Sequence, residues 1–67
     1  MATIEVDVND RSRVLEAFYA WRSAEHVSEI VNLPPESAGP GNLIVFSLVP
    51  REFLAVLDHE GIPYRAQ

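Results

Sequence analysis

Asp58, His59 and Glu60 form the densest group of side chains in this sequence that could do chemistry. Carboxylate and imidazole groups bind metal ions and move protons near neutral pH, and a second histidine, His26, lies earlier in the chain. Consecutive helical residues point about 100° apart, so these three side chains cannot meet at one ion, and the helix dipole alone favours a histidine at a helix end. We therefore predict no metal site, no cofactor and no catalytic residue.

A strip of aromatic and cationic side chains is the second candidate. Tyr19, Arg22 and His26 are three and four residues apart, which is the spacing of neighbours on one face of a helix. Such a strip either contacts the carboxylates of a partner or forms an ordinary helix surface. With apolar residues that the core is not expected to use, it predicts a contact surface made of Leu15, Tyr19, Arg22, His26, Ile30, Leu43 and Val45.

The charge composition excludes several classes of chemistry and partner. The chain has ten acidic and five basic residues, a formal net charge of −5, no cysteine and no lysine. Without lysine, Schiff-base chemistry and a P-loop are excluded, and without cysteine, disulfides and thiolate zinc sites are excluded. With no basic stripe, we expect no direct contact with nucleic acid. An acidic surface would instead compete with nucleic acid for a basic protein, through Glu5, Asp7, Glu25, Glu29, Asp58 and Glu60.

The N-terminal half predicts one strand and one long helix. Residues 3–8 alternate between apolar and polar side chains, which is typical of a strand with one buried face. Asn9 and Asp10 favour a helix N-cap, and apolar residues then recur at helical spacing. We expect this helix to run from near Asp10 toward Val31, either continuous or kinked near Ser23, because its apolar stripe changes direction along its length.

The C-terminal half predicts a loop, a strand, a short helix and a final strand. Residues 33–41 are rich in proline and glycine, which is typical of a loop. Residues 42–49 are almost continuously apolar, as in a central strand covered on both faces. Pro50 suits the first turn of a helix and Gly61 its end, and residues 62–66 have the pattern of a short strand.

The order strand, helix, strand, helix, strand predicts a single domain over residues 1–67 with an α+β fold. We expect a two-layer α/β sandwich in which a three-stranded sheet carries both helices on one face, and the second helix joins two parallel strands. The direction of the first strand is left open. In topology the pattern resembles the ferredoxin-like or ACT-like fold with one strand missing. The expected core is Ile4, Val6, Val14, Phe18, Trp21, Val45, Phe46, Phe53 and Leu57.

A three-stranded sheet covered on one side leaves its most apolar strand half exposed. Either Leu43 and Val45, or Ile44, Phe46 and Leu48, must point to the bare face. Burying each such side chain is worth about 1.5–3 kcal/mol, a large share of the stability of a small domain. We therefore expect the chain to act as a homodimer or bound to a larger protein.

These expectations combine into a small, acidic, non-enzymatic module for protein–protein interaction or regulation. We expect it in the cytoplasm, because residues 1–8 do not have the pattern of a targeting signal and no apolar run is long enough to span a membrane. Two alternatives stay open. One is an acidic inhibitor, of the kind that phages and mobile elements encode, which blocks a basic nucleic-acid-binding protein. The other is small-ligand binding or catalysis at a dimer cleft, using His26 or His59.

Overall fold

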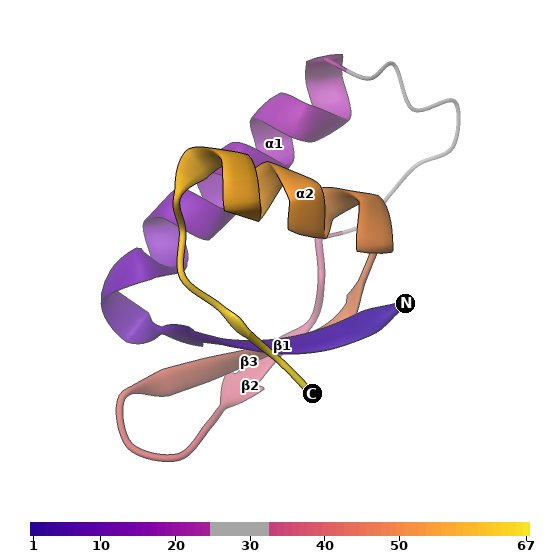
Figure 1. Ribbon diagram of the computed structural model, residues 1–67. Helices are drawn as coiled ribbons and strands as arrows, with labels where there is room; N and C mark the ends of the chain where they lie inside the picture. The colour runs from indigo at the N-terminus through magenta and orange to yellow at the C-terminus, as the bar shows by residue number, and fades with distance from the viewer. Residues whose placement is uncertain (25–32) are drawn as a thin grey trace.

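Both helices of the protein lie on one face of a four-stranded sheet (Figure 1). The computed structural model describes residues 1–24 and 33–67. Its elements are β1 (Ala2–Asp7), the 3-10 turn η1 (Val8–Asp10), α1 (Arg11–Ala24), β2 (Glu36–Ala38), β3 (Leu43–Val49), α2 (Arg51–Glu60) and β4 (Arg65–Ala66). The strand order is β2-β3-β1-β4 and every neighbouring pair is antiparallel. The predicted α+β class is confirmed, with one strand more than expected.

A 3-10 turn separates the first strand from the first helix. The side chain of Asp7 accepts a hydrogen bond from the backbone N–H of Asn9 at 2.8 Å, and η1 then leads the chain into α1. The predicted cap at residues 9–10 is therefore replaced by a cap at Asp7, where the strand ends. α1 is unbroken to Ala24, and the predicted continuation toward Val31 lies outside the described residues.

The predicted loop at residues 33–41 contains β2, which corrects the expected three-stranded sheet. β2 pairs with β3 so that Ser37 lies opposite Val45. The turn between the two strands is closed by the backbone N–H of Gly39, which donates to the Leu43 oxygen at 2.9 Å. All three β2 side chains are exposed, so this segment lacks the apolar alternation from which strands are predicted.

β1 lies between β3 and β4 and pairs antiparallel with both, which resolves the direction that the sequence left open. β3 and β4 therefore run in the same direction, as predicted for the strands that α2 joins, but they are not neighbours in the sheet. α2 ends at Gly61, whose φ of 70° lies in the left-handed region that favours glycine. The backbone N–H of Ile62 then donates to the Leu57 oxygen at 3.0 Å and directs the chain back to the sheet.

The core fills the space between the helices and the sheet. It consists of Ile4, Val6, Val14, Phe18, Phe46, Val49, Phe53, Leu57 and Ile62. The rings of Phe18 and Phe53 meet edge to face at 5.1 Å between centroids and join α1 to α2. Trp21 lies 5.6 Å from each of these rings and is partly exposed. The prediction of Val45 as a core residue is wrong, because its side chain lies on the opposite face of the sheet from Phe46.

A β-bulge near the end of β3 brings Val49 into the core, where it was not predicted. Ile4 pairs with Phe46 but Ala2 pairs with Val49, so β3 has one residue more than β1 over this stretch. Strict alternation would direct Leu48 to the same face as Phe46. With the bulge, Phe46 and Val49 are buried, and Leu48 is 60% exposed with a φ of 55°, a left-handed backbone conformation.

Candidate interaction surface

The sheet face opposite the two helices has no covering layer in the described part of the chain (Figure 1). Side chains that alternate with the core positions of β1 and β3 lie on this face. The register therefore decides between the two expected sets, with Leu43 and Val45 on the bare side and Phe46 in the core. We call this surface the open face; its residues are Thr3, Glu5, Asp7, Ser37, Leu43, Val45, Ser47 and Arg65.

Apolar and acidic side chains are cross-strand neighbours on the open face. Val45 pairs with Glu5 and Leu43 pairs with Asp7. The Cβ atoms of such pairs are about 4.5–5.5 Å apart. Both Leu43 and Val45 are half-buried, and the hairpin backbone at Gly39 approaches Val45 so closely that a Cβ on Gly39 would lie 3.2 Å from Val45 Cγ2. The open face thus has an apolar row on β3 next to an acidic row on β1.

Arg65 lies on the far side of the acidic row, opposite Glu5. No salt bridge joins these two side chains within the described structure. Beside them, at the end of β1, a shallow cleft of about 560 Å³ has Asp7 and Tyr64 in its walls. Burial raises the pKa of Tyr64, and the nearby Asp58 carboxylate raises it further. The cleft extends the acidic row toward the C-terminal strand.

The predicted aromatic and cationic strip on α1 is described in part. Tyr19 is 46% exposed, and the guanidinium of Arg22 lies 5.3 Å from the centroid of its ring. Leu15, expected on a flank that the core does not use, packs partly against the core instead. His26 and Ile30 lie outside the described residues. Tyr19 and Arg22 are therefore the described members of the strip, and they lie against each other.

The acidic residues predicted as one surface lie on different elements. Glu5 and Asp7 belong to the open face, whereas Asp58 and Glu60 are exposed near the end of α2. Two members lie outside the described residues, Glu25 and Glu29. No group of three or more His, Asp or Glu side chains in residues 1–24 and 33–67 could hold a metal ion. Of the four described acidic positions, Glu5 and Asp7 adjoin an apolar row.

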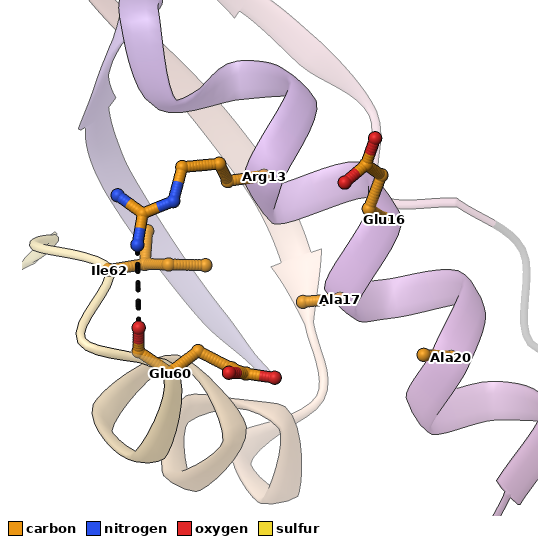
Figure 2. Close-up of a pocket in the computed structure, with 6 residues that line it drawn as sticks. All are labelled: Arg13, Glu16, Ala17, Ala20, Glu60 and Ile62. Carbon is orange, nitrogen blue, oxygen red and sulfur yellow. Dashed lines mark hydrogen bonds between the residues drawn. The ribbon is translucent and has the colours of Figure 1, made fainter.

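A groove of about 240 Å³ lies between α1 and the end of α2 (Figure 2). Arg13 extends across one end of it, donating to the backbone oxygen of Glu60 at 3.4 Å and to the Asp10 carboxylate at 3.1 Å. A cation at the C-terminal end of a helix stabilises the free carbonyls and the helix dipole. Ala17 and Ala20 line the groove and offer no reactive group. We interpret the groove as a structural contact between the two helices.

An ion pair between Arg11 and Glu36 joins α1 to β2 and was not predicted. Arg11 Nη2 donates to Glu36 Oε1 at 2.7 Å and Arg11 Nε donates to Glu36 Oε2 at 2.9 Å, a two-point arrangement. Hydrogen bonding to Arg11 lowers the pKa of the Glu36 carboxyl. The two residues are 25 positions apart, so no local spacing in the sequence reveals their contact. The pair attaches the edge strand to the helical layer.

Among the described residues no helix is long and apolar enough to cross a membrane. Comparison with protein-family models, curated proteins and solved structures finds no match to this chain. The function must therefore be inferred from the surface of the protein itself.

Proposed function

We propose that this chain is a non-enzymatic protein-interaction module that binds another protein through the open face. The observation that supports the proposal is the position of Leu43 and Val45 on a sheet face that neither α1 nor α2 covers. A sheet is most stable with a packed layer over each apolar face. Completing the burial of two half-buried aliphatic side chains contributes on the order of 1–3 kcal/mol, which is available to a partner.

The partner is a second copy of this chain or a larger protein in the cytoplasm. Residues 1–24 and 33–67 include nine buried apolar residues, which is a small core, and small domains commonly gain stability by association. An obligate partner would therefore raise the stability of the fold as well as carry the function.

Substitution on the open face tests this proposal. Val45→Asp adds a third carboxylate beside Glu5 and Asp7 and should abolish the complex, because a charge would be buried in an apolar contact. Tyr19→Ala is the matched control, since it removes a large exposed side chain from α1 on the other side of the molecule. The measurements are the mass in solution by light scattering and the recovery of bound protein from the native host by each tagged variant.

Loss of the same bound species in Val45→Asp, with its retention in Tyr19→Ala, is the expected result. Circular dichroism checks that Val45→Asp is folded. Equal retention of that species by both variants would contradict the open face as the binding surface. Loss of the bound species only in Tyr19→Ala would show that the strip on α1, and not the open face, is the binding surface.

The second candidate function is an acidic inhibitor of a basic nucleic-acid-binding protein. Glu5 and Asp7 favour it, because both lie in one row of the open face without a salt bridge in the described structure. An inhibitor that imitates a phosphate row loses affinity steeply as salt is raised, whereas a mainly apolar complex does not. Measuring the affinity for the isolated partner between low and high salt therefore distinguishes the two functions.

A further inference from the structure

The dimensions of the open face constrain the shape of its partner. The apolar row of β3 consists of Leu43 and Val45, and the exposed Leu48 lies at the bulge beyond its end. The five residue-to-residue steps from Leu43 to Leu48 cover roughly 17 Å, at about 3.3 Å per step. The same length corresponds to about three turns of an α-helix.

Leu48 combines two unfavourable features at one position. Its φ of 55° costs a residue with a Cβ roughly 1–2 kcal/mol, a strain that glycine avoids. Its side chain is also 60% exposed, so the strain is not offset by packing in the core. Leu48 lies within the bulge, between the buried residues Phe46 and Val49, and is itself excluded from the core. A large apolar residue that is both strained and exposed is a candidate for contact with another molecule.

A helix packed on the apolar row of β3 is wide enough to contact the acidic row of β1 as well. A helix with its side chains is about 10 Å across, whereas neighbouring strands are about 4.8 Å apart. A helix lying along β3 therefore also covers β1, where Glu5 and Asp7 stand beside Val45 and Leu43. Carboxylates covered by a partner need basic groups opposite them.

The charges of the open face make a second copy a poor occupant. Two stacked copies would bring four carboxylates, from Glu5 and Asp7 of each, against two guanidinium groups from Arg65. The whole chain also carries a net charge of −5, so two copies repel each other, whereas a basic partner is attracted over a long range.

From the proposed function we infer that the open face binds a basic amphipathic helix of another protein. Apolar side chains of that helix pack on Leu43, Val45 and Leu48, and its lysine or arginine side chains pair with Glu5 and Asp7. The bound helix forms a third layer, on the opposite side of the sheet from α1 and α2.

An unbiased helix library tests the inference. Phage-displayed helical peptides of about 15 residues, roughly four turns, are selected against the full chain and counter-selected against Val45→Asp. The selected peptides should carry an apolar stripe flanked on one side by lysine or arginine. Selected peptides without enriched basic residues would overturn the inference.

Variants then measure each row separately, using one selected peptide and fluorescence anisotropy. Leu48→Gly should weaken binding about tenfold, as expected for loss of an anchor side chain, without loss of folding. The double variant Glu5→Gln, Asp7→Asn should also weaken binding about tenfold at low salt and reduce the salt dependence. Tyr19→Ala should bind like the parent chain.

The outcomes separate this inference from the proposed function. Suppose that the chain is a dimer by light scattering and that Val45→Asp makes it a monomer. The open face would then be an interface occupied by a second copy, and the inference of a bound helix would be wrong. If Val45→Asp, Leu48→Gly and the acidic double variant leave both peptide binding and self-association unchanged, the inference and the proposed function both fail.

Discussion

The two faces of the sheet differ sharply, although the same strands build both. On the helix side, Ile4, Val6 and Phe46 are at most 1% exposed. On the open face, the residues between them include Glu5 and the half-buried Val45, which pair with each other. The apolar run of β3 is therefore divided between the two faces, because one set of its side chains holds the fold together and the other lies on the open face.

The largest expected effect is on the free energy of unfolding. It is tested at Val45 and Phe46, two adjacent residues of β3 that lie on opposite faces of the sheet. Phe46→Ala should destabilise the protein by about 3–5 kcal/mol, because it leaves a cavity under both helices. Val45→Ala should cost less than about 1.5 kcal/mol, because only part of its side chain is removed from water. Urea unfolding followed by circular dichroism measures both. Equal losses would mean that Val45 is as essential to the fold as Phe46.

The second largest effect is an increase in stability, and it is expected for a substitution at the β-bulge. Leu48→Gly should stabilise the isolated chain by about 1 kcal/mol, because glycine removes the strain of a positive φ. Leu48→Ala is the control, since it keeps the Cβ and therefore the strain. The midpoint of thermal unfolding should rise in the glycine variant only. A rise of the same size in Leu48→Ala would show that exposure, and not backbone strain, is the cause.

The smallest effect concerns the edge of the sheet where β2 meets the helical layer. Because Arg11 lowers the pKa of Glu36, the contribution of the pair to stability is present above the ordinary glutamate pKa and is lost as the pH falls through the lowered value. In Arg11→Gln the Glu36 pKa should return toward its ordinary value. A carboxyl titration followed by NMR measures the change. An unchanged titration midpoint would exclude Arg11 as the cause.

The sequence predicted which residues of β1 are buried, but it did not predict this for β3. In β1 the strict alternation assigned Ile4 and Val6 to the core correctly. In β3 nearly every residue is apolar, so alternation did not distinguish the faces, and Val45 was wrongly assigned to the core. The bulge had no local sign, because Leu48 occupies a position where glycine would have indicated it.

Pairing between distant segments was beyond local patterns. β2 has three exposed residues between prolines and glycines, so its strand character depends on β3 beside it. Glu5, Asp7, Leu43 and Val45 were each named as candidate surface residues. Their assembly into adjacent acidic and apolar rows depends on the register of β1 with β3, which no residue type in the sequence specifies.

The central position of β1 has a consequence for how the protein is made. β1 leaves the ribosome before both of its neighbours in the sheet, β3 and β4, which come later in the chain. Until they exist, Ile4 and Val6 have no sheet to join. Such long-range pairing slows folding and keeps apolar segments accessible to other chains while it is incomplete. The sheet can therefore close only after residues through Ala66 have been synthesised.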